Sequence, residues 1–175
     1  MKFLIIIFIT LKLLIEISEE VSSELESGHL FELLDNGCKN VDIRFDSRYF
    51  EKLINCKTIH GYLRISDLDI PENFSMSFTD IFEVTGYILI ENVSGLRSLG
   101  NLFPNLSVLR GEILHHDFSL LIRNNGDLEN IGIGLMTYIG KGDVLIENNP
   151  KLCYIETIDW MQFGKELNIT KEVGN

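Results

Sequence analysis

A short pattern that recurs four times constrains the fold of this chain more than any other feature. Each copy is a run of alternating apolar residues that ends on Asp or Asn, and the copies are Gly61–Asp67, Gly86–Asn92, Ser119–Asn124 and Asp143–Asn148. Successive closing residues are 25, 32 and 24 residues apart. Such a period is typical of solenoids, in which each repeat forms one coil. We therefore predict a stacked β-solenoid with one short strand per coil.

The alternation within each copy predicts which side chains point into the solenoid. Successive strand residues point to opposite faces, so the alternate apolar residues share a face with the closing polar residue. We therefore expect Asp67, Asn92, Asn124 and Asn148 to lie inside, where an Asn side chain can hydrogen-bond the backbone of the adjoining turn. The residues between them are expected to face outward and to form a recognition surface.

The N-terminus predicts export. Residues 1–17 carry the basic Lys2 directly after Met1 and continue as an apolar run, and the chain becomes acidic at Glu19 and Glu20. This order is typical of a secretory signal peptide, assigned to residues 1–23, with an acidic segment at 24–37. The alternative is an uncleaved signal anchor, but the run is shorter than the ~20 apolar residues that span a bilayer and contains Lys12. We expect a secreted mature chain.

Charge and motifs argue against several functional classes. The net charge of −11 disfavours partners that need a basic patch, namely nucleic acids and anionic membranes. His115 and His116 are adjacent on a strand-like segment, so we expect their side chains on opposite faces, unable to hold a metal together. Gly140-Lys141 is followed by Gly142 rather than the Ser or Thr of a phosphate-binding loop. We expect no enzyme activity, no cofactor and no metal.

The chain has three cysteines, an odd number that needs an explanation in an oxidising compartment. Cys38 and Cys56 flank a segment that we predict to be a strand (42–45) and a helix (47–53) with Asp46 as its N-cap. This arrangement would bring the two sulfurs together in a disulfide that closes the first coil. Cys153 is then a free thiol or an intermolecular link.

Four triplets match the acceptor pattern for N-glycosylation, and they begin at Asn73, Asn92, Asn105 and Asn168. We expect glycans at Asn73, Asn105 and Asn168. We expect none at Asn92, because the repeat assigns that residue to the interior. Near the C-terminus, Ile158, Trp160 and Met161 are expected to cap the last coil, and residues 166–175 are expected to be frayed.

Several ordered segments resemble the receptor L domain, a module of insulin-type and epidermal-growth-factor-type receptor tyrosine kinases. The segments include Cys38–Arg44, Ile59–Ile65, Leu102–Gly111 and Asn149–Trp160. They are closest to the first L domain of insulin-type receptors, and the chain is also similar to nematode secreted insulin/EGF-receptor-like domain proteins. The resemblance assigns residues 38–162 to the domain and 163–175 to a tail. It implies an all-β solenoid, a single-stranded right-handed β-helix that is leucine-rich-repeat-like with short helical caps.

The resemblance also implies a function. In the family, outward residues of the first L domain hold a peptide hormone, and the matching candidates here are Asp42, Arg44, Arg64, Glu91, His116, Phe118, Leu121, Arg123 and Glu147. We therefore expect a non-catalytic secreted protein whose partner is a growth-factor-like peptide or a receptor ectodomain, and which modulates receptor signalling. The alternatives are a truncated N-terminal fragment of an insulin-type receptor tyrosine kinase, or a structural or adhesive module.

Overall fold

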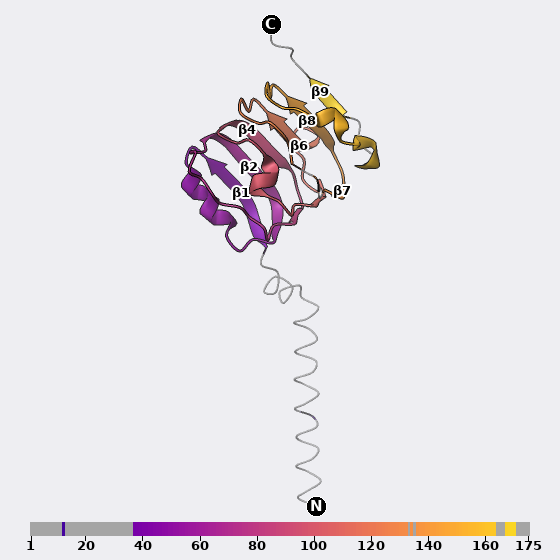
Figure 1. Cartoon of the computed structure of the whole chain (residues 1–175). Helices are drawn as coiled ribbons and strands as arrows, with labels where there is room; N and C mark the ends of the chain where they lie inside the picture. The colour runs from indigo at the N-terminus through magenta and orange to yellow at the C-terminus, as the bar shows by residue number, and fades with distance from the viewer. Residues whose placement is uncertain (1–11, 13–36, 133, 135, 164–166, 171–175) are drawn as a thin grey trace, which may run out of the picture. The chain divides into compact units, whose positions relative to one another are not determined.

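The computed structural model describes residues 12, 37–132, 134, 136–163 and 167–170 (Figure 1). The chain divides into two compact units, residues 1–36 and 37–175. Apart from residue 12, the predicted signal peptide lies outside the described residues, as does the acidic segment apart from residue 37. Within the described part, no helix is long and apolar enough to cross a membrane.

The second unit is built mainly from short strands. In chain order its elements are β1 (Cys38–Arg44), the 3-10 helix η1 (Ser47–Leu53), β2 (Thr58–Asp69), β3 (Glu83–Val84), β4 (Ile88–Ser94), the helical turn α3 (Leu99–Leu102), β5 (Val108–Leu109), β6 (Phe118–Arg123), β7 (Tyr138–Ile139), β8 (Asp143–Glu147), the 3-10 helices η2 (Ile155–Thr157) and η3 (Trp160–Phe163), and β9 (Leu167–Thr170).

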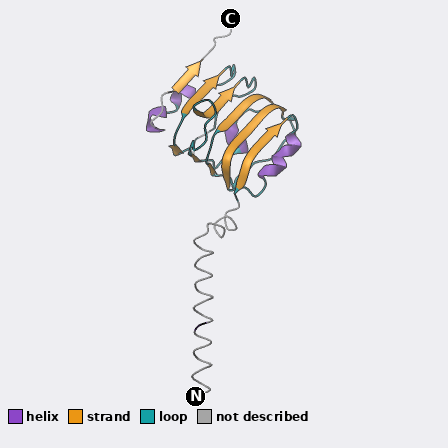
Figure 2. Cartoon of the chain, turned by 180° about the vertical axis from the view of Figure 1, so that it is seen from behind, coloured by secondary structure: helices purple, strands orange, loops and turns teal. Residues whose placement is uncertain are grey.

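All pairs between these strands are parallel. The nine strands form one continuous sheet with two parts that β2 joins. Strands β1, β2, β4, β6, β8 and β9 make the part called the long sheet, and the start of β2 with β3, β5 and β7 makes the part called the short sheet. Neighbouring strands of the long sheet belong to successive coils, so Ile88 pairs with Leu63 before it and Leu120 after it. Figure 2 shows these strands as successive orange rungs. The predicted all-β solenoid is confirmed.

The apolar residues of the repeat fill the interior as predicted. Their side chains are at most 2% exposed, and they are Leu63, Ile65, Ile88, Ile90, Leu120, Ile122, Val144 and Ile146. Burying an aliphatic side chain of this size contributes roughly 1.5–3 kcal/mol. The stacked files therefore supply much of the driving force that holds the coils together.

The closing polar residues lie outside, so the prediction of an inward polar file was wrong for Asp67, Asn92, Asn124 and Asn148. All four are exposed, and their φ angles lie between 52° and 59°. Asn and Asp enter this left-handed region more readily than most residues. A left-handed residue shifts the strand alternation by one position, so the residue after it turns inward.

The residues one position later turn inward instead, and in the last two copies they are the polar residues Asn125 and Asn149. Asn125 is completely buried, and its Oδ1 accepts from the Val93 N–H at 3.0 Å. Its Nδ2 donates to the Ile90 carbonyl at 3.2 Å and to Oδ1 of Asn149 at 3.0 Å. Asn149 in turn donates to the Ile122 carbonyl at 2.9 Å. The backbone-bonding role predicted for the closing residues therefore belongs to Asn125 and Asn149.

Glycine sets the corner between the short and the long sheet. The Gly86 N–H donates to the Gly61 carbonyl at 2.6 Å, and a Cβ on Gly86 would lie 2.5 Å from that oxygen. The residue after each glycine is a tyrosine, and the rings of Tyr62 and Tyr87 stack with centroids 5.0 Å apart. The close approach of the two backbones therefore requires glycine.

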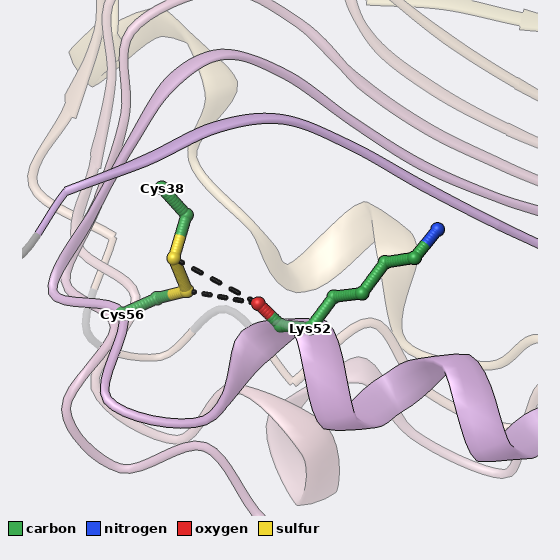
Figure 3. Close-up of a disulfide and its surroundings, with 3 residues drawn as sticks. All are labelled: Cys38, Lys52 and Cys56. Atoms are coloured by element: carbon green, nitrogen blue, oxygen red, sulfur yellow. Dashed lines mark hydrogen bonds between the residues drawn. A yellow bond between two sulfur atoms is a disulfide. The ribbon is translucent and has the colours of Figure 1, made fainter.

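A disulfide closes the first coil, as predicted. Cys38 and Cys56 are bonded, with Cα atoms 5.5 Å apart. Both sulfurs lie against the carbonyl oxygen of Lys52, at 3.8 and 3.3 Å (Figure 3). Because an oxidised sulfur carries no proton, these are packing contacts. The helix between the cysteines is the 3-10 helix η1, and its predicted N-cap Asp46 accepts from the Arg48 N–H at 2.9 Å.

The C-terminal end differs in part from the prediction. Trp160 is 6% exposed, and its Nε1 donates to the Ile155 carbonyl at 3.3 Å, so it packs on the last coil as expected. Met161 is 73% exposed and takes no part in the cap. The prediction of a frayed tail was wrong for residues 167–170, because β9 adds a further parallel strand beside β8.

Candidate functional site

The outward side of the long sheet gathers most of the predicted site residues into two files. The first file is Asp42, Arg64, Leu89, Leu121 and Leu145, and the second is Arg44, Ser66, Glu91, Arg123 and Glu147. We call these ten residues the outward face. Parallel pairing places each residue beside its equivalent in the next coil, so the strands themselves fix the spacing of the charged groups.

Arg123 joins two carboxylates across three strands of the outward face. Its Nε lies 2.7 Å from Oε1 of Glu91, and its Nη1 lies 3.9 Å from Oε1 of Glu147. The Nε–H is not aimed at an acceptor, so the contact with Glu91 is an ion pair rather than a hydrogen bond. The Glu91 side chain is only 16% exposed. Partial removal from water strengthens such pairs relative to fully solvated ones.

The first-coil end of the outward face carries a second ion pair. Arg44 Nε lies 2.8 Å from Oδ1 of Asp42. On the neighbouring strand, Arg64 Nε donates to the Ser66 hydroxyl at 3.1 Å. The face therefore carries three arginines and three carboxylates, although the whole chain has a net charge of −11. A partner would meet an alternating pattern of charge here rather than a field of one sign.

The hairpin formed by residues 112–118 lies beside this face. His115 and Phe118 exchange two backbone hydrogen bonds, at 2.9 and 3.0 Å, and His116 is left-handed with φ 48°. Because the chain turns at His116, the rings of the two histidines meet edge to face with centroids 4.4 Å apart. The expectation that they point to opposite sides of a strand was wrong. His116 is exposed, whereas Phe118 is half-buried.

His115 lies near the middle of the outward face. Its ring packs on Tyr87, with centroids 5.2 Å apart. Burial lowers the pKa of His115, and the positive charges of His116, Arg123 and Arg64 lower this pKa further, whereas Glu91 raises it. These neighbours come from the hairpin itself and from β2, β4 and β6, so charged groups of three strands act on His115.

Leu121 and Leu89 belong to the outward face by register but are only 2% and 1% exposed. Leu121 was predicted as a ligand contact. In this conformation it packs beneath the surface and offers almost no contact area. Its burial indicates that neighbouring groups close over the centre of the face, whereas charged side chains such as Arg44, Arg123 and Glu147 stay partly exposed.

Phe45 is a candidate residue that the sequence analysis missed. It is 76% exposed and left-handed, with φ 66°, and its N–H donates to the Asp67 carbonyl at 3.2 Å. It therefore occupies in the first coil the closing position that Asp67 occupies in the next. A bulky side chain in this backbone region is uncommon, and strained residues cluster at functional sites. Extending the repeat alignment to residues 42–45 would have found it.

The other predicted sites lie away from the outward face or at its edge. Cys153 is exposed and outside the disulfide. Asn73 and Asn105 are exposed in turns, and Asn168 lies in β9 opposite Leu145. Across residues 37–132, 134 and 136–163, no group of three His, Cys, Asp or Glu side chains could hold a metal. The glycans and the intermolecular link remain predictions.

Comparison with known proteins gives a consistent result. A family model described as the receptor L domain matches residues 55–163. The insulin-like receptor of Drosophila melanogaster is 43% identical over 129 residues, which cover 74% of this chain and 6% of that receptor. The putative molluscan insulin-related peptide(s) receptor of Lymnaea stagnalis is 41% identical, covering 73% and 8%. The insulin-like growth factor 1 receptor of Xenopus laevis is 41% identical, covering 69% and 9%.

Proposed function

The chain belongs to the receptor L domain family, and on that premise we propose that it is a non-catalytic, secreted binding protein. Its partner is an extracellular peptide of the insulin or growth-factor type, or the ectodomain of a receptor for such a peptide. By occupying one of them it modulates signalling by receptor tyrosine kinases. The outward face is the contact surface.

The observation that carries this proposal is the ordered charge pattern of the outward face. Glu91, Arg123 and Glu147 stand in one file on adjacent strands, at 16%, 33% and 26% side-chain exposure. Charges fixed in register favour the correct orientation of a partner and exclude partners with mismatched charges. Phe45 directly follows β1 and Phe118 begins β6, two strands of the outward face. These two residues supply the aromatic anchors that binding hot spots commonly use.

The relatives support a peptide partner by their names, which describe receptors for insulin, insulin-like growth factor and insulin-related peptides. The chain spans between 6% and 10% of the length of the curated relatives it matches.

Secretion rests on two features. The predicted signal peptide at residues 1–23 provides entry to the secretory pathway. The Cys38–Cys56 disulfide suits an oxidising compartment, because structural disulfides are rare in the reducing cytosol.

The test is direct binding by the secreted protein. The 175-residue chain is expressed in an animal-cell secretory host and purified from the medium. It is then titrated by calorimetry with insulin-family peptides and with the ectodomain of an insulin-type receptor. We expect at least one dissociation constant tighter than ~100 μM. Weaker binding to every probe would contradict the proposal and favour a structural or adhesive module.

The remaining alternative is that the sequence is the N-terminal part of an insulin-type receptor tyrosine kinase. Sequencing of full-length transcripts separates this alternative from a one-domain product. A reading frame that continues past Asn175 into further extracellular domains would establish the receptor, and the outward face would then act within that larger protein.

A further inference from the structure

Asn92 begins an N-glycosylation triplet, Asn92-Val93-Ser94, and the structure removes the reason for excluding it. Asn92 is left-handed and exposed, whereas Val93 after it turns into the core. We infer that Asn92 carries an N-linked glycan at the border of the outward face. The inference rests on the secretion proposed above, because the glycan is added only in the secretory pathway.

The geometry of the Asn92 amide fits a glycan. Its Nδ2 donates a hydrogen bond to Oδ1 of Asp67 at 2.9 Å. A primary amide nitrogen carries two protons, so one can be replaced by a sugar while the other keeps this bond. The contact with Asp67, one coil earlier, would then hold the first sugar in a fixed direction, away from the buried Val93.

The modification is a balanced group transfer from a lipid-linked oligosaccharide pyrophosphate. The Asn92 Nδ2 forms a bond to C1 of the first sugar. The bond from C1 to the pyrophosphate oxygen breaks, the lipid pyrophosphate leaves with the electron pair, and Nδ2 releases one proton. No oxidant or reductant takes part. The transfer occurs on the entering chain, so the later contact of the Ser94 hydroxyl with Asp69 does not block it.

The position gives the glycan a role in selecting the partner. Asn92 directly follows Glu91, which belongs to the second file and pairs with Arg123. A glycan there would stand at the edge where β4 leaves the outward face. It would restrict approach to this file from that edge, and it would leave the side that carries the 112–118 hairpin open.

The repeat supplies an internal control. Asn124 is the equivalent closing residue of the next coil, and it is also left-handed and exposed. It lacks a glycosylation triplet, because Gly126 stands where a hydroxyl residue is needed. A Cβ added to Gly126 would meet no atom within 4 Å. The substitution Gly126→Ser therefore creates a triplet at the same place in the solenoid without a steric clash.

The experiment uses the full chain secreted from animal cells. Peptide-N-glycosidase F treatment in heavy-oxygen water converts each glycosylated Asn to a labelled Asp, and mass spectrometry of the peptides locates the label. We expect label at Asn92 as well as at Asn105. Asn92→Gln and Ser94→Ala should each remove one glycan on a gel, Ser94→Thr should keep it, and Gly126→Ser should add one at Asn124.

The outcomes separate this inference from the proposed function. An unlabelled Asn92 in secreted protein that is labelled at Asn105 or Asn73 would overturn the inference and leave secretion standing. A chain that stays in the cells with no sequon labelled would overturn both. Label at Asn92 that disappears in Ser94→Ala and persists in Ser94→Thr would establish the site, and a gain at Asn124 in Gly126→Ser would show that the closing position accepts glycans.

Discussion

The Oδ1 atom of Asn125 accepts a hydrogen bond from the backbone N–H of Val93, 32 residues earlier in the chain and at 3.0 Å. The same side chain donates to Ile90 and to Asn149, and it is fully buried. One residue therefore links three successive coils through bonds that water cannot replace.

Replacement of Asn125 by Leu should destabilise the domain strongly. The Val93 N–H and the Ile90 carbonyl would lose their partner in the interior, and each unsatisfied group costs about 1–3 kcal/mol. We expect the free energy of unfolding, measured by urea denaturation followed by circular dichroism, to fall by roughly 2–4 kcal/mol. The control Asn124→Gly changes an exposed, left-handed neighbour to a residue that tolerates this backbone conformation, so it should cost much less. Equal effects of the two substitutions would contradict the assigned role.

Phe45→Asn should stabilise the domain and weaken binding at the same time. A non-glycine residue held in the left-handed region costs on the order of 1 kcal/mol, and Asn tolerates this region better than Phe. Thermal unfolding should therefore shift upward for Asn. Ala, which has no such tolerance, should give little gain. If Phe45 anchors the partner, calorimetry should show weaker binding for both variants, and unchanged binding would exclude it from the contact surface.

His115 should make stability depend on pH. Burial and three nearby cations lower its pKa below the ordinary value of 6.5. As pH falls through 6.5, His115 takes up a proton in the unfolded chain before it does so in the folded one. The free energy of unfolding therefore decreases from pH 6.5 down to the folded pKa, and below that pKa this residue causes no further loss. An NMR titration should give a midpoint below 6.5 for His115, and Arg123→Gln should raise it. An unchanged midpoint in this variant would remove Arg123 from the causes.

Charge reversal at Arg123 should test the outward face. Arg123→Glu places a third carboxylate between Glu91 and Glu147, which reverses the middle charge of the file. We expect affinity for the partner to fall about tenfold or more. The matched control is Arg110→Glu, which breaks the ion pair with Glu83 on the short sheet. Biolayer interferometry should show near-normal binding for that variant, and comparable losses in both would argue against a specific face.

Much of this architecture follows from the sequence because the strand pattern is local. The alternation of apolar and polar residues predicts that Leu63 and Ile65 are buried. Glu91 and Arg123 each stand one position before the closing Asn of their copy, which predicts that they lie side by side. The left-handed turn at Asn92 is different. Asn suits both a strand end and a left-handed turn, so composition alone does not decide between them.

Other features depended on contacts between distant segments. The alternation of its own strand predicts an outward Leu121, but the structure buries this side chain, and a pattern within one strand does not reveal which other groups cover it. Strand β9 is only four residues long, and the open edge of β8 beside it determines its conformation. A short segment carries too little periodicity to reveal such pairing in advance.

The hairpin of residues 112–118 has a further consequence. Eleven positions separate Leu109 from Leu120, whereas four separate Val84 from Ile88, yet the strands on both sides keep their pairing partners. The length added at this one connection shifts the pairing with β8 once, between Phe118 and Leu120, and the ladder is regular from Leu120 to Arg123. This connection is therefore where related genes can gain or lose residues, and where an engineer can graft a loop, to change what the protein recognises without redesigning its scaffold.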